Sequence, residues 1–466
     1  MIESKAKLIL LITTFAQRTD WNLIMGASSF KRCPVSNCLM TNDKSLSTSE
    51  FDAVLFHLGN IEDLEPEELP DKLNRTANQR YVMFFHEHPS VQWTERLILK
   101  LGINHFFNWT MTYRLDSDIP IPYGWIVPKL GPAYHVPSIH EIGNWNPRYD
   151  STLFVDSLEA KPSKFFALAR RPRGAAWAVS HCNTDSEREL YVNELSKHMQ
   201  IDIFGKCGSS LCDSLKNVSC SDYIVQNYMF YLAFENAFCD DYVTEKLWSW
   251  MSREIVPVVF GQANYSSITP PHSVINALDY SEPKYLAAYL KHLMANEVDY
   301  LSYFWWKDHY AINANSRISG NIELWPDVGA MSSKLGLQPS FCKLCEMLND
   351  AEQPSKVVDL TTYLLKEGHC RQKGTQSWSK YKSIAEERLI YDSLLFASLL
   401  LIIFATKLLI SKLEWRHSKV ILKVKSFISC EVIRLCNFYL ALFCLLVLFL
   451  ILSRASLGNF LANIMP

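Results

Sequence analysis

Side chains that suit a nucleotide diphosphate gather between two apolar runs in the stretch from Phe230 to Gly261. A diphosphate leaving group needs a cation and hydrogen-bond donors, and ribose hydroxyls need acceptors such as carboxylates. Lys246 and Glu245 supply both kinds of group, so the spacing predicts a nucleotide site. The same residues also suit the start of a solvated helix capped by Thr244. Spacing alone leaves both interpretations open, because short motifs match by chance.

A strand, a loop, a helix and a second strand are predicted to position these side chains. The apolar run Tyr231 to Phe234 is typical of a buried strand, and apolar residues recur at helical spacing between Leu247 and Met251. The β-branched run Ile255 to Val259 predicts the second strand, although Pro257 does not fit a strand interior. Ligands of open α/β sheets bind outside the carboxyl ends of the strands, which is where the polar cluster falls.

A candidate catalytic base follows another predicted strand, Tyr81 to Phe85. Glu87 comes two residues after this strand and lies between His86 and His88. One positioned carboxylate suffices to take a proton from an attacking hydroxyl. On the residues alone, either histidine is the better base near neutral pH.

The run FYLAFENAFCDDYVTEKLWSWMSREIVPVVFG, Phe230 to Gly261, resembles the signature of the α-1,3-fucosyltransferases, glycosyltransferase family 10. Members of this family transfer fucose from GDP-fucose to glycans. Further matches follow in the family's order: FFHEHPS at Phe84 to Ser90, FNWTMTYRLDSDIPIPYG at Phe107 to Gly124, WAVSHC at Trp177 to Cys182, and FCKLC at Phe341 to Cys345. Together the matches cover roughly residues 5 to 350.

The resemblance implies an enzyme that transfers L-fucose from GDP-fucose, with inversion, to the 3-hydroxyl of N-acetylglucosamine in glycoprotein glycans. Glu87 matches the family's catalytic glutamate, which favours it over the histidines. The residues that match donor-binding positions are Arg188, Tyr231, Glu235, Asn236, Tyr242, Glu245 and Lys246. GDP-fucose is the expected donor, and we expect neither a tightly bound cofactor nor a metal. Asp116 and Asp118 therefore hold a loop in this interpretation.

One departure from the family pattern favours a second function. His181 stands where the family has asparagine, and an imidazole differs in shape from an amide donor. The alternative is a catalytically degenerate relative that binds GDP-fucose or a glycan without transfer. Retention of Glu87 together with Arg188, Glu235, Asn236, Tyr242, Glu245 and Lys246 favours catalysis.

The resemblance implies an α/β fold of the GT-B type with two Rossmann-like lobes, residues 1–150 on the acceptor side and residues 151–350 binding GDP-fucose. Residues 351–393 are predicted as a linker. The first lobe is expected to contain strands at 7–15, 54–56 and 81–85 and a helix at 91–101, and the second lobe a strand at 165–169, a helix at 187–199 and a strand at 201–204. The formal charge is −2 without a basic concentration in the first 390 residues, so no nucleic-acid partner is expected.

The C-terminal part predicts a membrane hairpin. Residues 394–410 and 435–452 are apolar enough for two transmembrane helices, with a basic loop at 411–434 and a tail at 453–466. The positive-inside rule assigns the basic loop to the cytosol. We therefore expect a Golgi membrane protein with a lumenal catalytic part and a glycan or glycoprotein acceptor as partner. No signal peptide is visible, so an incomplete or wrongly joined chain is an alternative expectation.

Cysteines and glycosylation sequons indicate an oxidising compartment. Ten of the thirteen cysteines lie between Cys33 and Cys370, and the sequons in the same part are at Asn74, Asn108, Asn217 and Asn264. Spacing leaves open whether Cys33, Cys38, Cys342 and Cys345 form a zinc site or disulfides. The resemblance implies disulfides that join the C-terminal pair to the N-terminal pair.

Overall fold

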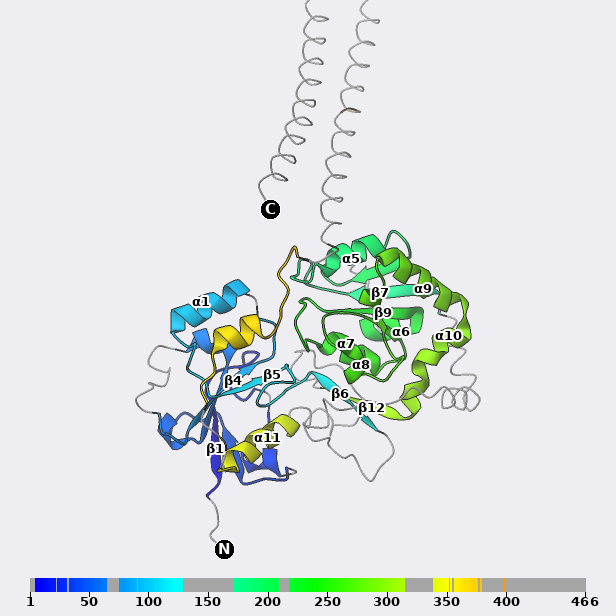
Figure 1. Cartoon of the computed structure of the whole chain (residues 1–466). Coiled ribbons are helices and arrows are strands. Elements are labelled where there is room, and N and C mark those ends of the chain that lie inside the picture. Colours follow the sequence, from blue (N-terminus) through cyan, green and yellow to red (C-terminus); the bar gives the residue numbers. More distant parts are fainter. Residues whose placement is uncertain are drawn as a thin grey trace, which may run out of the picture. The chain divides into compact units, whose positions relative to one another are not determined.

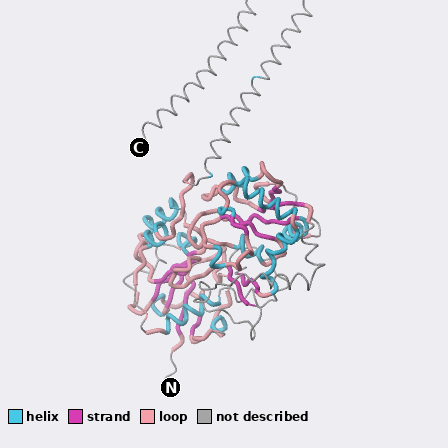
Figure 2. Tube along the Cα trace, turned by 45° about the vertical axis from the view of Figure 1, so that its right-hand side comes forward, coloured by secondary structure: helices cyan, strands magenta, loops and turns pink. Residues whose placement is uncertain are grey.

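The computed structural model describes residues 5–21, 23–31, 33–64, 75–89, 91–128, 171–208, 218–314, 338–351, 353, 356–375, 378 and 398. Apart from Ser398, these residues belong to one compact unit, Met1–Ser383. The unit contains two five-stranded sheets and a two-stranded ribbon. Figure 2 shows the strands in separate groups, with helices packed around them.

The first sheet is parallel throughout and has the order β2-β1-β3-β4-β5. Its strands are β1 (Lys7–Leu11), β2 (Cys38–Thr41), β3 (Ala53–His57), β4 (Arg80–Phe85) and β5 (Trp109–Thr112). The predicted helix α1 (Val91–Leu101) follows β4. Because parallel strands share one carboxyl edge, Glu87 lies at that edge, two residues beyond the end of β4.

Both faces of the first sheet are covered by segments from distant parts of the chain. One face packs against α11 (Gln338–Asn349), whose Phe341 and Leu344 are buried with residues of β1 and β3. The other face packs against α1 and a C-terminal segment that buries Leu360 and Tyr363. Figure 1 shows α11, in yellow, beside the blue strand β1. Residues from both ends of the described unit therefore complete the first core.

The second sheet is also parallel and has the order β11-β10-β9-β7-β8. Its strands are β7 (Arg173–Ala178), β8 (Ile201–Phe204), β9 (Tyr228–Phe234), β10 (Val256–Phe260) and β11 (Ile275–Asn276). Pro257 fits β10 because β11 pairs with this strand only from Val258 onward. Among the described strands, β9 alone pairs with β10 at Pro257, and a missing N–H is tolerated on the side that has no ladder partner.

Helices and an antiparallel ribbon complete the second core. The helices are α5 (Arg188–Leu195), α6 (Cys220–Asn227), α7 (Glu245–Met251), α8 (Tyr265–Ile268), α9 (Pro283–Ala295) and α10 (Glu297–Leu301), and the ribbon pairs β6 (Gly124–Pro128) with β12 (Tyr310–Ala314). The 3-10 helices of the unit are η1 (Ala27–Phe30), η2 (Thr48–Glu50), η3 (Leu58–Asp63), η7 (Ala277–Asp279) and η8 (Ser302–Asp308), and η9 (Thr362–Lys366) is a π-helix. The helix predicted for 187–199 ends earlier, since Lys197 and His198 donate to oxygens only three residues back. The strand predicted at 165–169 lies outside the described residues.

The prediction of transmembrane helices as part of the fold class is corrected. Within the described ranges, no helix combines the length and the apolar character needed to cross a membrane. Both predicted spans, 394–410 and 435–452, lie outside those ranges except for Ser398, as do the basic loop and the tail. The fold that the structure supports is an α/β fold with two parallel sheets. The division at residue 150 falls among residues that are not described and stays a prediction.

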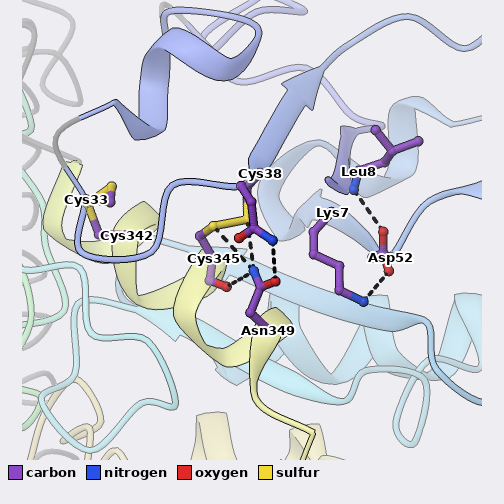
Figure 3. The surroundings of a disulfide bond; sticks show 9 residues. Lys7, Leu8, Cys33, Cys38, Asp52, Cys342, Cys345 and Asn349 are labelled. Carbon is purple, nitrogen blue, oxygen red and sulfur yellow. Dashed lines mark hydrogen bonds and ion pairs between the residues drawn. A yellow bond between two sulfur atoms is a disulfide. The ribbon is translucent and has the colours of Figure 1, made fainter. Parts of the chain in front are cut away.

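The predicted cysteine pairing is confirmed as two disulfides, Cys33–Cys342 and Cys38–Cys345. Both join the first 40 residues to α11 (Figure 3). Beside them, the Asn349 amide donates to the Cys345 carbonyl at 2.8 Å. Two further disulfides, Cys182–Cys207 and Cys239–Cys370, lie in the second half of the unit. Covalent links thus hold α11 against the first sheet.

Residues after α11, predicted as a linker, pack against the rest of the unit where they are described. Val358 and Leu360 donate backbone hydrogen bonds to Phe107 and Asn104 beside β5. Trp378 is 5% exposed and packs among aromatic residues of the second core. The segment is therefore part of the fold.

Candidate active site

Glu87 lies at the carboxyl edge of the first sheet, where the hydroxyl of Tyr242 binds its carboxylate and that of Tyr123 lies nearby. The Glu87 side chain is exposed. Tyr242, which precedes α7, donates to Oε2 at 3.0 Å. Tyr123, just before β6, donates to the His86 carbonyl at 2.8 Å, and its hydroxyl lies 3.5 Å from Oε1. Burial raises the pKa of both tyrosines well above the usual value, so both hydroxyls stay protonated and act as donors. The carboxylate is thus oriented while remaining open to solvent.

The surroundings of the two neighbouring histidines do not suit a general base. His86 is buried, and its Nε2 lies 2.7 Å from the Ile121 carbonyl oxygen. Burial lowers the pKa of His86 to about 3 and also lowers the pKa of His88. His88 packs its ring edge-on against Tyr242, with ring centroids 5.5 Å apart. Of the three side chains, Glu87 has the exposure that a base needs.

At the start of α7, Lys246 lies among oxygen atoms. Its Nζ is 2.8 Å from Thr244 Oγ1, 3.3 Å from Glu245 Oε1 and 3.4 Å from Glu235 Oε2. Burial opposes the charged form, yet the two carboxylates outweigh it and raise the pKa of Lys246, with a smaller contribution from Glu87. The ammonium is therefore positively charged and belongs to the same site as Glu87.

Glu235 is a buried support of this helix start. Its side chain is 1% exposed and accepts hydrogen bonds from Thr244 N at 2.8 Å and from Thr244 Oγ1 at 2.9 Å. Burial raises the pKa of Glu235, while Lys246 opposes that shift. Thr244 is in turn the N-cap of α7 and accepts from Lys246 N. The predicted helix cap and the predicted nucleotide cluster are thus the same residues.

Arg188 and Asn236 lie at the carboxyl end of β9. The Arg188 guanidinium is buried, donates to the Phe234 carbonyl and lies 3.5 Å from the His181 carbonyl. Burial lowers the pKa of Arg188, and the nearby Glu235 carboxylate opposes the shift. His181 is exposed and meets Arg188 through its backbone oxygen. Asn236 is half-buried, and its Oδ1 has no hydrogen-bond partner among the described residues.

Tyr231 differs from the other predicted donor residues. It is 4% exposed and stacks on Trp250 with ring centroids 3.6 Å apart, inside the second core. Arg188, Glu235, Asn236, Tyr242, Glu245 and Lys246 instead lie around the ends of β7 and β9 and the start of α7. The structure brings these six together with Glu87, whereas Tyr231 packs beneath them.

The acidic pairs bind groups of the protein itself. Asp118 accepts from Thr110 N at 2.8 Å and pairs with Lys356, and Asp116 pairs with Arg114. Asp241 Oδ2 accepts from Leu115 N at 3.1 Å. Within the described part of the chain, no group of three or more metal-ligating side chains is present.

Two of the four predicted glycosylation sites are described. Asn264 is exposed, and Ser266 of its sequon donates to its Oδ1 at 2.7 Å. Asn108 is 3% exposed, accepts from Tyr81 N at 2.9 Å and donates to the Lys356 carbonyl at 2.8 Å. An amide buried in this way cannot carry a glycan in the folded chain, which corrects that candidate. Asn74 and Asn217 lie outside the described residues.

Sequence reasoning missed two contributors to the site. Tyr123 received no role from the sequence, although it stacks on His86 at 3.6 Å between ring centroids and donates to the His86 carbonyl beside Glu87. Trp378 lies far outside the motifs, yet its Nε1 donates to the Ser186 carbonyl beside Arg188. The PYG run around Tyr123 was a usable signal, because it lies in a matched motif, whereas Trp378 carried none.

Comparison with known proteins shows the family of this chain. Residues 168–363 match the family model described as "Glycosyltransferase family 10 (fucosyltransferase) C-term", and residues 4–124 match "Fucosyltransferase, N-terminal". Alpha-(1,3)-fucosyltransferase C of Drosophila melanogaster is 35% identical over 350 residues, which is 73% of each chain. The gorilla 4-galactosyl-N-acetylglucosaminide 3-alpha-L-fucosyltransferase FUT6 is 33% identical over 59% of this chain and 66% of its own length. A crystal structure of an alpha1,3-fucosyltransferase with GDP-fucose is 15% identical and covers 65% of this chain and 83% of its own, with a TM-score of 0.38.

The family matches thus identify a glycosyltransferase. The chain belongs to glycosyltransferase family 10, the fucosyltransferases. The prediction of an enzyme of the α-1,3-fucosyltransferase family is confirmed at the level of the family.

Proposed function

We propose that the protein transfers L-fucose from GDP-fucose, with inversion, to the 3-hydroxyl of an N-acetylglucosamine residue in glycoprotein glycans. The observation that carries the proposal is the Glu87 carboxylate, which is exposed and accepts a hydrogen bond from the hydroxyl of Tyr242. A carboxylate oriented in this way can take the proton of an acceptor hydroxyl as that hydroxyl attacks the anomeric carbon. Inversion needs only this one base.

Donor binding is assigned to the side chains around α7 and the end of β9. Departure of GDP leaves negative charge on its β-phosphate, and a fixed cation stabilises this charge most in the transition state. The charged Lys246 ammonium, with Glu87 acting on its pKa, supports that role. Arg188 is the second candidate cation, and Asn236 offers an amide to the nucleotide. Glu245, one-third exposed, is the candidate acceptor for sugar hydroxyls.

Glu235 and Tyr231 take supporting parts in this proposal. The Glu235 carboxylate fixes Thr244 and Lys246 from below. Tyr231 supports the floor of the site through its stacking on Trp250. In this proposal both residues support the donor-binding side chains without contacting the donor themselves.

The lumen of the Golgi apparatus is the proposed location. Disulfides persist in oxidising compartments and are rare in the cytosol. Four disulfides are present between Cys33 and Cys370 in the described part of the chain. This distribution supports a lumenal catalytic unit.

The test is fucose transfer by the full chain, purified after passage through the secretory pathway, with Glu87→Gln as the control. Acceptors are a terminal N-acetyllactosamine disaccharide and an N-glycan core, each analysed by mass spectrometry. A gain of one deoxyhexose, reduced by about 100-fold or more in Glu87→Gln, is expected. The acceptor that gains mass identifies the substrate class.

The second candidate function, binding without transfer, rests on His181 and makes a different prediction. In that case the folded chain binds GDP or GDP-fucose, and neither acceptor gains mass. Transfer by Glu87→Gln at the wild-type rate would remove Glu87 as the base.

A further inference from the structure

A segment beyond the family match reaches the candidate donor site. The match to the family model ends at residue 363. The following residues, 368–375 together with Trp378, lie against the second sheet, and we name them the C-terminal strap. The Cys239–Cys370 disulfide fixes the strap to the loop after β9, and Arg371 N donates to the Phe238 carbonyl at 2.8 Å. The strap therefore starts from a covalently anchored position close to Asn236.

Three contacts run from the strap to the turn before Arg188. Lys373 donates to the Asn183 side chain, and Gly374 N donates to Glu187 Oε2 at 3.1 Å. Trp378 Nε1 donates to the Ser186 carbonyl at 2.8 Å. Trp378 also packs against Phe238 and Phe260, with ring centroids 4.9 Å and 4.8 Å away. The ring is thus clamped while its N–H contacts the turn.

Ser186 also forms hydrogen bonds with residues at the end of β9. Its N donates to the Asn236 carbonyl at 2.9 Å, and its Oγ donates to the Glu235 carbonyl at 2.7 Å. The next turn residue, Glu187, has a φ of 52°, which is unfavourable for a side chain of this type and must be held by its surroundings. Arg188 then begins α5 and donates to the Phe234 carbonyl. One side of Ser186 therefore binds the strap and the other binds the donor-site loop.

We propose that Trp378 is a positioning residue for the donor site: through Ser186 it holds the turn that presents Arg188 and the loop that presents Asn236. The inference rests on the proposed function, because it assumes that these residues bind GDP-fucose. It adds a segment outside the matched family region to the donor-binding machinery. In this role Trp378 contacts other residues of the protein and does not contact the donor.

Trp378→Phe tests the inference in the full chain, because it keeps an aromatic ring and removes the indole N–H. The matched control is Trp305→Phe. Trp305 is 1% exposed, and its Nε1 donates to the Pro271 carbonyl at the same 2.8 Å. Both variants therefore lose a buried indole-to-carbonyl hydrogen bond and comparable ring volume. Only Trp378 contacts the turn before Arg188.

We expect Trp378→Phe to raise KM for GDP-fucose by about fivefold, with kcat within about twofold of wild type. The dissociation constant of GDP, measured by equilibrium titration, should rise in parallel. Trp305→Phe should lower the melting temperature by a similar amount without changing either value. Should Trp378→Phe not fold, Glu187→Gln weakens the contact from Gly374 and should raise KM by about twofold.

Two results would overturn the inference. If Trp378→Phe loses thermal stability but keeps the wild-type KM and GDP affinity, Trp378 has a structural role alone. If it changes KM no more than Trp305→Phe does, the effect is not specific to the turn. A wild-type chain that is folded but neither binds GDP nor transfers fucose would instead contradict the proposed function itself.

Discussion

Replacing Tyr242 with phenylalanine tests whether the tyrosine orients the carboxylate of Glu87, the proposed base. The ring of Tyr242 is 1% exposed and packs edge-on against Tyr113, with ring centroids 4.9 Å apart. Phenylalanine keeps this packing and removes one hydrogen bond, the 3.0 Å contact from Oη to Glu87 Oε2. The fold should therefore tolerate the change, and the carboxylate should lose its stronger donor.

The magnitude follows from the type of bond. A hydrogen bond to a charged group contributes about 1.5–3 kcal/mol. Glu87 is exposed, so water recovers part of that contribution, and Tyr123 still lies 3.5 Å from Oε1. We therefore expect a loss of about 1–2 kcal/mol in the transition state, which corresponds to roughly a 5- to 30-fold lower kcat.

Steady-state kinetics with saturating GDP-fucose and varied acceptor would measure this loss. Tyr300→Phe is the matched control, because Tyr300 is fully buried and its hydroxyl donates to the Met229 carbonyl at 2.8 Å. The control should leave kcat unchanged. An unchanged kcat in Tyr242→Phe, with a raised KM for GDP-fucose, would refute the reasoning, since Tyr242 would then serve donor binding alone.

Three further predictions concern charge, pH and disulfides. Lys246→Met should raise KM for GDP-fucose by about 10- to 30-fold in steady-state assays, because the diphosphate loses its cation. Burial lowers the pKa of His86 to about 3, so the unfolded chain takes up this proton first. As the pH falls from 6 to 4, His86 alone should therefore lower the unfolding free energy by about 1.4 kcal/mol for each pH unit. In urea titrations, His86→Gln should make the unfolding free energy less dependent on pH over this range. Serine in place of both Cys38 and Cys345 should cost about 2–5 kcal/mol of unfolding free energy by the same assay, with kcat retained.

Local patterns predicted the elements and the residue types of the site. The run Arg80–Phe85 is apolar over five consecutive residues, and the following Glu87 falls at the sheet edge because parallel strands share that edge. Helical spacing likewise identified α7, and the family resemblance supplied both N-terminal to C-terminal disulfides. These features depend on residues close together in the sequence or on a motif long enough to identify the family.

Contacts between distant segments could not be predicted in the same way. The bond from Tyr242 to Glu87 joins residues 155 positions apart and depends on how the loops after two different sheets meet. Asn108 satisfies the sequon pattern, but its position beside β4 turns its amide toward Tyr81 N. Trp378 shows no periodicity and has a role only because its ring enters a core formed by other segments. Sequence spacing does not show which distant segments a side chain will contact.

The surroundings of Lys246 separate two carboxylates that the sequence presents as equivalent. Glu235 is enclosed, with Thr244 N and Oγ1 already donating to it, so its contact with Lys246 persists whatever enters the site. Glu245 is one-third exposed, and its contact with the ammonium, at 3.3 Å, is about as long as that of Glu235, at 3.4 Å. An ammonium has three N–H donors, so under the proposed function we expect a phosphate oxygen to displace the more accessible acceptor, Glu245. In that proposal Glu245 accepts a sugar hydroxyl, whereas the buried Glu235 continues to hold the cation in place.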